Sequence, residues 1–360
     1  MEHFAREGDA HTRAGSPVGP LPDAAAVEAI VDAAFWASLQ REEGYVPRIS
    51  LAFLPPEGAA RHLRLATPLP LGPRALSRLG PAVERPGIHL GVWGNGEDLL
   101  VWGTIRAIPA FTFVVEVLGP GLLVVKHRTR ADSAKFENVA VFEGEQVKVL
   151  SRAAVDVSKG PVLLRLLLAP ELSPPAEAPD DVLVRLAVSM RAHGRGGTLL
   201  VVPAGTDGWK DSIVTPVAYA VEPAFTELAD LVRTEEHGGA RGSAALVRAV
   251  DAVAGLTAVD GATVITDRHE LLAFGVKIGR PDGRPQVQEV LVSEPVEGAV
   301  PVTVAPLQLG GTRHLSAAQF AQDQPASVAL VASQDGRFTI FAWSAADGVV
   351  RAHRVETLLF

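Results

Sequence analysis

Two short motifs in the C-terminal half of the chain combine residue types that bind phosphates and metals. Asp260-Gly261-Ala262 precedes an apolar run, and Gly311-Thr312-Arg313-His314 precedes a predicted helix. Free backbone N–H groups at a helix start favour an anion, and glycines let phosphate oxygens approach the backbone closely. The second motif therefore predicts a cradle for a polyphosphate.

The side chains of the two motifs suit the same ligand. Arg313 can make bidentate contacts to a phosphate, and His314 can donate to a phosphate oxygen or shuttle a proton. Asp260 is a hard oxygen ligand that can hold Mg²⁺ or Mn²⁺ against the phosphates, which would offset charge during nucleotidyl transfer. Gly261 and Ala262 leave room beside it for a flat base or a ribose. If both motifs line one cleft, the chain can bind ATP.

Each motif also has an ordinary structural interpretation. Asp-Gly-Ala is common in turns, and a Gly-Thr pair before a helix is a common N-cap. Under that interpretation Arg313 and His314 are solvated and the chain has no affinity for nucleotides. Other signatures are missing, because the sequence has no P-loop, no dinucleotide fingerprint and no nucleophile elbow. The segment "HELLA" at 269–273 has Ala273 where a zinc protease needs its second histidine, so we expect a polar turn into a strand.

Composition excludes several classes of function. A chain of 360 residues is long enough for two domains of ordinary size. The net charge of -8 gives no electrostatic footprint for a nucleic-acid duplex or an anionic membrane surface. Without cysteine the chain can form no disulfide, thiolate metal site or cysteine nucleophile. No signal peptide and no membrane span is recognisable, so we expect a cytoplasmic protein with no nucleic-acid or membrane partner.

The N-terminal half predicts one helix followed by hairpins. Asp23 is a candidate N-cap for a helix over residues 23–43, which has apolar residues at helical spacing. Asn95-Gly96 then separates two β-type runs, and "FTFVVEVLGPGLLVVKH" and "ENVAVFEGEQVKVL" repeat this layout. Successive hairpins predict an antiparallel sheet, so residues 1–155 are expected to form an α+β domain.

A proline-rich segment separates this half from the next. Residues 156–182 contain "ELSPPAEAPDD", which excludes a continuous helix and predicts a linker. Beyond it, residues 183–350 are expected to form a mainly β, mixed sheet flanked by helices, which makes the whole chain α+β. The predicted elements are a helix over 181–193, the strand "GTLLVVP", two helical segments within 224–255, a hairpin turning near Asp267-Arg268, the strand "QEVLVSE", the helix after Gly311 and a hairpin turning at Asp335-Gly336.

Four segments of the C-terminal half, taken in order, resemble a known family. "GGTLLVVP", "VDGATVITDRHELLAFGV", "GGTRHLSAAQF" and "ASVALVASQDGRFTIF" are similar in order and spacing to the diadenylate cyclase (DAC, DisA N-terminal-like) domain. That family carries Asp-Gly-Ala and an Arg-His-Arg preceded by Gly-Thr. The resemblance covers roughly residues 185–345, and the hairpins and "EEGYVPRISLAFLPP" of the N-terminal half look like the sensor domains sometimes fused ahead of such cyclases.

The resemblance implies a reaction and a role for each matching residue. Two ATP molecules would condense to cyclic di-AMP with release of two pyrophosphates, in the presence of Mg²⁺ or Mn²⁺. Asp260 would be the metal ligand that helps activate a ribose 3'-hydroxyl, and Arg313 and His314 would be catalytic contacts to phosphates. Each domain holds one ATP in this family, so a homodimer or larger homo-oligomer is implied. The implied nucleotide-binding positions are Gly261, Ala262, Gly311, Thr312 and Ser333.

Three departures from the family pattern keep two hypotheses open. Leu315 stands at the last position of Arg-His-Arg, Ala258-Val259 precede the aspartate where Leu-His is common, and Ser333-Gln334-Asp335 replaces a more acidic Ser-Glu-Glu. Loss of a charged phosphate contact commonly costs about 1.5 to 3 kcal/mol. The favoured interpretation is a diadenylate cyclase regulated by its N-terminal domain, in which another cation such as Arg337 compensates for Leu315. The alternative is a DAC-fold sensor that binds an adenine nucleotide without turnover and needs no such compensation.

Overall fold

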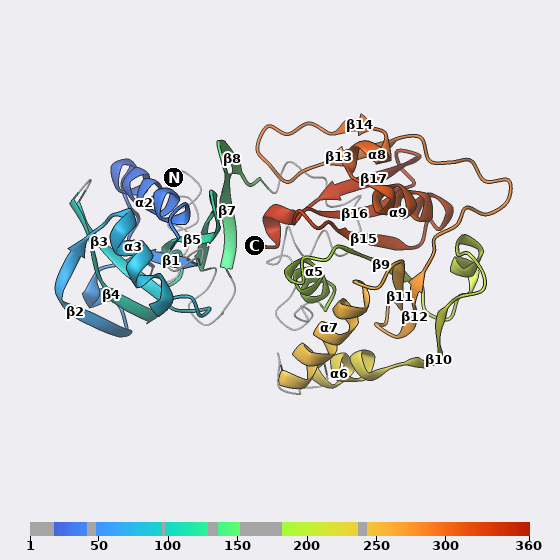
Figure 1. The fold of residues 1–360 in the computed structure, drawn as a ribbon, viewed down its shortest axis with the longest axis horizontal. Helices are drawn as coiled ribbons and strands as arrows, with labels where there is room; N and C mark the ends of the chain where they lie inside the picture. Colours follow the sequence, from blue (N-terminus) through green and yellow to red (C-terminus); the bar gives the residue numbers. More distant parts are fainter. Residues whose placement is uncertain (1–17, 42–47, 96–97, 129–135, 152–181, 237–242) are drawn as a thin grey trace. The chain divides into compact units, whose positions relative to one another are not determined.

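The computed structural model describes residues 18–41, 48–95, 98–128, 136–151, 182–236 and 243–360 (Figure 1). The chain divides into two compact units, Met1–Leu150 and Ser151–Phe360. Each unit is a mixed sheet with helices, so the predicted α+β class is confirmed. The predicted linker 156–182 lies outside the described residues up to position 181. In the described residues, no helix has both the length and the apolar character needed to cross a membrane.

The first unit is an eight-stranded sheet with helices packed on it. Its strand order is β2-β4-β3-β1-β5-β6-β7-β8. Its helices and strands are α2 (Ala24–Ser38), β1 (Ile49–Phe53), β2 (Arg61–Pro70), α3 (Pro73–Leu79), β3 (His89–Asn95), β4 (Asp98–Ala107), β5 (Phe113–Gly119), β6 (Leu122–Arg128), β7 (Phe136–Glu143) and β8 (Gln146–Val149), with short 3₁₀ turns at Pro56–Gly58 and Gly80–Ala82.

The sequence predicted most of these elements, with two corrections. Asp23 caps α2 as expected, since its carboxylate accepts a hydrogen bond from the Ala26 N–H at 2.8 Å. The helix ends at Ser38 rather than near residue 43, and the Ser38 hydroxyl there donates to the Phe35 carbonyl. The hairpins β3–β4, β5–β6 and β7–β8 are present. The sheet is not wholly antiparallel, because β2 and α3 intervene between β1 and β3 and leave these two strands parallel.

The second unit is built on a nine-stranded sheet of order β10-β12-β11-β9-β15-β16-β17-β13-β14. Its helices are α5 (Val182–Ala192), α6 (Glu227–Glu236), α7 (Ala244–Leu256), α8 (Pro306–Leu309) and α9 (Thr312–Asp323). Its strands are β9 (Gly197–Val202), β10 (Tyr219–Phe225), β11 (Ala262–Thr266), β12 (Leu271–Val276), β13 (Val290–Ser293), β14 (Val302–Val304), β15 (Val328–Ala332), β16 (Phe338–Ser344) and β17 (Val349–Arg354); 3₁₀ turns lie at Gly208–Ser212 and Glu356–Leu358.

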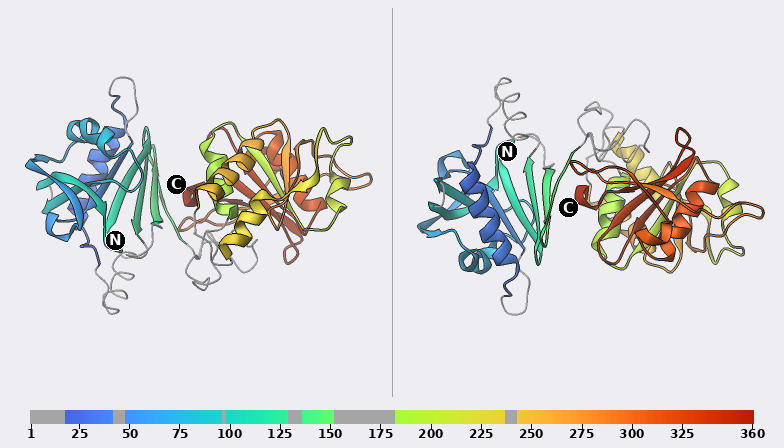
Figure 2. Two further views of the ribbon diagram at one scale, coloured as in Figure 1. Left: turned by 90° about the horizontal axis from the view of Figure 1, so that it is seen from below. Right: turned by 90° about the horizontal axis from the view of Figure 1, so that it is seen from above.

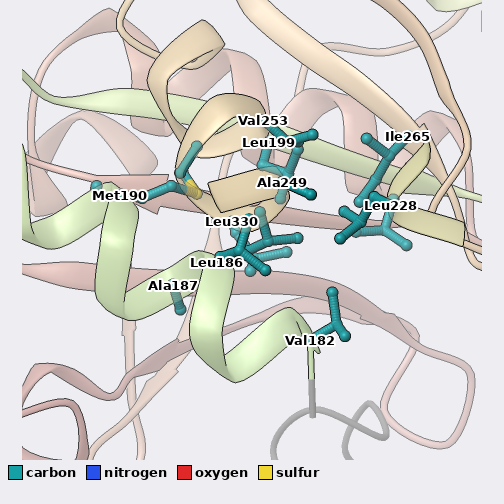
Figure 3. Close-up of a cluster of buried hydrophobic side chains, with 14 of the residues drawn as sticks. Val182, Leu186, Ala187, Met190, Leu199, Leu228, Ala249, Val253, Ile265 and Leu330 are labelled. Atoms are coloured by element: carbon teal, nitrogen blue, oxygen red, sulfur yellow. The ribbon is translucent and has the colours of Figure 1, made fainter. Parts of the chain in front are cut away.

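Helices cover this sheet on both faces. One buried cluster joins α5, α6 and α7 to the sheet, and a second joins α9 to alternate residues of the same strands. Figures 1 and 2 show α5, α6 and α7 grouped apart from α9. In Figure 3 side chains of α5 and α7, including Leu186 and Val253, converge on Leu199, Ile265 and Leu330 of the central strands. Every residue of β9 and β11 is buried, as expected of strands covered on both faces.

The tight packing of these central strands fixes where their ends lie. Burial of apolar side chains stabilises by roughly 25 cal/mol per Å² of area removed from water, and the cost of moving such a strand is correspondingly high. Loops that enter or leave β9, β11 and β15 are therefore anchored within a residue or two of a rigid core. The predicted motif Asp260-Gly261-Ala262 enters β11 in this way.

Candidate functional site

The candidate site lies at one end of the central strands of the second unit. Ala262, the first residue of β11, is opposite Thr198 near the start of β9. On the other side of β9, Gly197 is opposite Ala332, the last residue of β15. The loop before β11, the loop before β9 and the turn after β15 therefore meet at the same end of the sheet. The end of β12 joins them, because Val276 is the antiparallel partner of Ala262.

Gly261 is required by the backbone of this site. Its φ is +125°, a conformation that residues with a side chain rarely adopt. A Cβ at this position would lie 2.5 Å from the carbonyl carbon of Gly275 and 2.7 Å from the carbonyl oxygen of Val276. Glycine thus lets the loop before β11 run directly against the end of β12, and this contact determines where Asp260 stands.

Asp260 projects into solvent and forms an ion pair. Its side chain is 92% exposed, and its Oδ2 atom accepts a hydrogen bond from the Nζ atom of Lys277 at 2.6 Å. This hydrogen bond and the charge of Lys277 hold the pKa of Asp260 below its usual value, and the charge of Arg313 lowers it further. The carboxylate is therefore ionised at neutral pH.

Arg313 extends from the first turn of α9 to the start of β9. Its Nη1 atom would lie 2.9 Å from a Cβ placed on Gly196, so glycine at 196 leaves room for the guanidinium. The start of the helix has no side-chain cap, and Gly311 and Thr312 are both exposed there. The helix start thus keeps the solvent-facing N–H groups that an anion site needs. Asp260 and Arg313, which lie in the two separate motifs, therefore share one site.

His314 does not join Asp260 and Arg313. The residue is 3% exposed, and its ring lies edge-on to Phe341 with centroids 6.0 Å apart. A Cβ on Gly310 would lie 2.3 Å from the His314 Nδ1 atom, so the ring also fills the space left by that glycine. Burial lowers the pKa of His314 below its usual value, which keeps the ring neutral at pH 7.

The turn after β15 completes the site. Ser333 donates its backbone N–H to the Arg337 carbonyl, and the Gln334 side-chain amide donates to the Arg195 carbonyl at 3.3 Å, which links this turn to the loop before β9. Arg337 is paired with Asp335 through a 3.4 Å contact between Nε and Oδ2. Leu315, the residue that departs from the family pattern, is partly buried in the apolar cluster under α9.

The sequence analysis missed three residues that line the surroundings of Asp260. Lys277 follows the end of β12 and is 56% exposed, and Tyr219 of β10 stacks on Phe274 with parallel rings 4.9 Å apart. Tyr219 is half exposed, and it lies against Gly275, which leaves no room for a Cβ. The stacked rings present an aromatic surface two strands from Asp260. A flat base could use such a surface, since aromatic rings stack on every nucleobase.

The side chains around Asp260 suit a metal ion that binds together with a nucleotide. No cluster of three His, Cys, Asp or Glu side chains suited to a metal occurs in the part of the chain that the structure describes. Mg²⁺ commonly binds through one or two carboxylates and completes its shell with substrate phosphates and water. A single carboxylate such as Asp260 can therefore bind an ion whose other ligands are phosphates and water. The described residues around it do not supply a complete set of protein ligands.

Comparisons with known proteins concern mainly the first unit. Residues 16–106 match the family described as "Probable sensor domain DACNV", about a quarter of the chain. Residues 16–106 are therefore similar to a probable sensor domain. This match spans α2, β1, β2, α3, β3 and nearly all of β4. It agrees with the prediction of a sensor domain ahead of the C-terminal half. No curated protein matches the chain significantly.

Among solved structures, one similar chain is the hypothetical membrane spanning protein from Bacillus cereus. It is 14% identical, and the match covers 53% of this chain and 68% of that chain with a TM-score of 0.26. Neither fold nor function can be argued from a similarity this low.

Proposed function

We propose that the chain is a diadenylate cyclase that condenses two ATP molecules to cyclic di-AMP and two pyrophosphates. The observation that carries the proposal is that Asp260 directly precedes β11 and Arg313 approaches the start of β9, two strands that pair in parallel at this end. The sensor-domain match supports it, because the family name DACNV points to the region ahead of a DAC domain. The first unit would then regulate the second.

In this proposal the chain's own residues bind and orient the nucleotide. Arg313 and the exposed start of α9 would hold the phosphates, since both present N–H donors to solvent. Asp260 would hold the divalent ion and so help to activate the ribose 3'-hydroxyl. That ion, Mg²⁺ or Mn²⁺, would neutralise negative charge on the phosphates. The 3'-oxygen would form a bond to the α-phosphorus of the facing ATP, and the bond from that phosphorus to pyrophosphate would break. Gly261 would line the nucleotide, and Ser333 would approach it from the turn after β15. Ala262, which the sequence also suggested for the nucleotide pocket, is 2% exposed and belongs to the apolar core of the sheet.

His314 would act in this reaction as a positioning residue. Because its ring is buried against Phe341, it holds the first turn of α9 in place rather than contacting a phosphate. Arg313, one residue earlier, then projects toward Gly196 from a fixed helix start. A site holding one ATP can complete the reaction only when a second such site faces it, so a homodimer or larger assembly belongs to the proposal.

The test is to incubate the purified full chain with ATP and Mg²⁺ or Mn²⁺ and to measure cyclic di-AMP by mass spectrometry. We expect product from the wild type and at least about 100-fold less from Asp260→Asn, a loss typical of removing one catalytic contact. Asp207→Asn is the matched control, because Asp207 is also an exposed aspartate paired with a lysine in the same unit. This control should keep full activity.

The alternative function is a sensor that binds an adenine nucleotide without turnover. Leu315 favours it, because its side chain packs into the apolar cluster under α9 and provides no charge to the site. Nucleotide binding without product would support this alternative, and absence of both would mean that the two motifs are only turns and helix caps.

A further inference from the structure

Lys277 lies beside Asp260 at the end of β12, in the site to which we assign the nucleotide. It follows β12, whose last residue Val276 is opposite Ala262, the residue after the Asp260-Gly261 loop. Its ammonium group reaches back across the strand end to the Asp260 carboxylate at 2.6 Å. The contact thus occupies an oxygen of the carboxylate that the proposed reaction requires.

We propose that Lys277 is a polyphosphate-binding residue, held by Asp260 until a nucleotide enters and then transferred to the phosphates. The proposal rests on the proposed function, because it assigns a ligand to the same site. Lys277 and Asp260 are 56% and 92% exposed, and exposed ion pairs of this kind contribute little to stability. Breaking the ion pair therefore costs little free energy. The flexible side chain of lysine then lets its ammonium group turn from the carboxylate to a phosphate.

The charge balance of the site favours transfer of Lys277 to the phosphates of a bound nucleotide. Leu315 supplies no cation, and His314 is buried with a lowered pKa, so neither can balance the negative charge of a triphosphate. Arg313 remains as the cation of the helix start. Arg337 lies in a similarly exposed ion pair, but its partner is Asp335 on the turn after β15 and not Asp260. Lys277 is an exposed cation beside Asp260, and it can supply the second positive charge that the site needs.

The experiment measures ATP binding by titration calorimetry to the full chain in EDTA, where no metal contributes. Lys277→Met removes the charge and keeps most of the stem, and it should weaken ATP binding roughly tenfold, the usual effect of losing one charge-assisted hydrogen bond. Lys210→Met is the matched control, because Lys210 is 57% exposed and 2.6 Å from Asp207, which reproduces the geometry of the tested pair. It should bind ATP like the wild type.

Two further titrations separate phosphate binding from other roles. Adenosine, which lacks phosphates, should bind Lys277→Met and the wild type equally, and an equal loss for adenosine and ATP would overturn the proposal. Asp260→Asn weakens the hold on Lys277, so its metal-free ATP affinity should rise, and a fall would overturn the proposal. If the wild type binds ATP and Lys277→Met binds it equally well, only this inference fails. If the wild type binds no nucleotide with or without Mg²⁺, the proposed function fails with it.

Discussion

Asp260 and His314 belong to two motifs that look alike in sequence, yet the Asp260 side chain is 92% exposed and His314 is 3% exposed. Each motif places a glycine immediately before a helix or strand: Gly261 precedes β11, and Gly311 precedes α9, whose third residue is His314. In the first motif the glycine is confined, and the aspartate side chain is exposed and paired with Lys277. In the second, Gly311 has open space around it and the histidine is confined. The two motifs therefore contain two kinds of residue: an exposed one, which can meet a ligand, and a buried or confined one, which holds the backbone in place.

The largest expected effect on stability comes from replacing the confined Gly261 with alanine, compared with the same replacement at the unconfined Gly311. Gly261→Ala forces a φ of +125° on alanine and drives its Cβ into the Gly275 backbone, so the free energy of unfolding should fall by about 3 kcal/mol or more. Gly311→Ala meets nothing within 4 Å at an ordinary φ of -73°, and it should cost less than about 1 kcal/mol. Urea unfolding of both variants measures the difference, and equal stabilities would break the comparison.

A smaller effect is expected from the titration of His314. Its pKa in the folded state is lowered by burial, so below the ordinary value of 6.5 the unfolded chain binds a proton that the folded chain resists. The stability that the neutral ring contributes is complete above pH 6.5 and is lost as the pH falls toward the lowered pKa. The charged groups that act on the ring are Asp335, which raises its pKa, and Arg337, Arg354 and Arg313, which lower it.

His314→Leu isolates this contribution because leucine cannot titrate. We expect the thermal midpoint of the wild type to fall more between pH 7 and pH 5 than that of the variant. The comparison uses the change with pH rather than the midpoint itself, since the substitution also alters packing against Phe341. Equal losses in the two proteins would show that the buried imidazole does not resist protonation.

Local signals in the sequence predicted the parts of the fold that depend on neighbouring residues. Asp23 predicted the start of α2, and Gly-containing turns predicted the hairpins. The edge strand β2 was missed because eight of its ten residues are exposed, which leaves no alternation of buried and exposed positions to recognise. The parallel pairing of β1 and β3 was also missed, since it joins segments separated by another strand and a helix.

The site could have been predicted more fully than it was. His314 belongs to a series with Ala317, Ala318 and Ala321 at helical spacing, and this pattern indicates the buried face of α9. Lys277 could have been placed from the hairpin register, because residues just beyond a cross-strand pair face each other and Ala262 pairs with Val276. The approach of Arg313 to Gly196 could not have been predicted, because this contact depends on how α9 packs on the sheet.

The smallest expected effect on stability is that of Asp260→Asn. Because the carboxylate is almost fully exposed and its partner Lys277 remains hydrated, the substitution should leave the thermal midpoint unchanged within the error of the measurement. The same substitution should remove nearly all cyclase activity if Asp260 meets the nucleotide. Loss of activity without a change in stability identifies a residue that acts on the ligand. In Gly261→Ala, by contrast, activity and stability should fall together. A clear fall in the thermal midpoint of Asp260→Asn would show that this exposed residue also holds the loop in place. The division into residues that meet the ligand and residues that hold the backbone would then be wrong for Asp260.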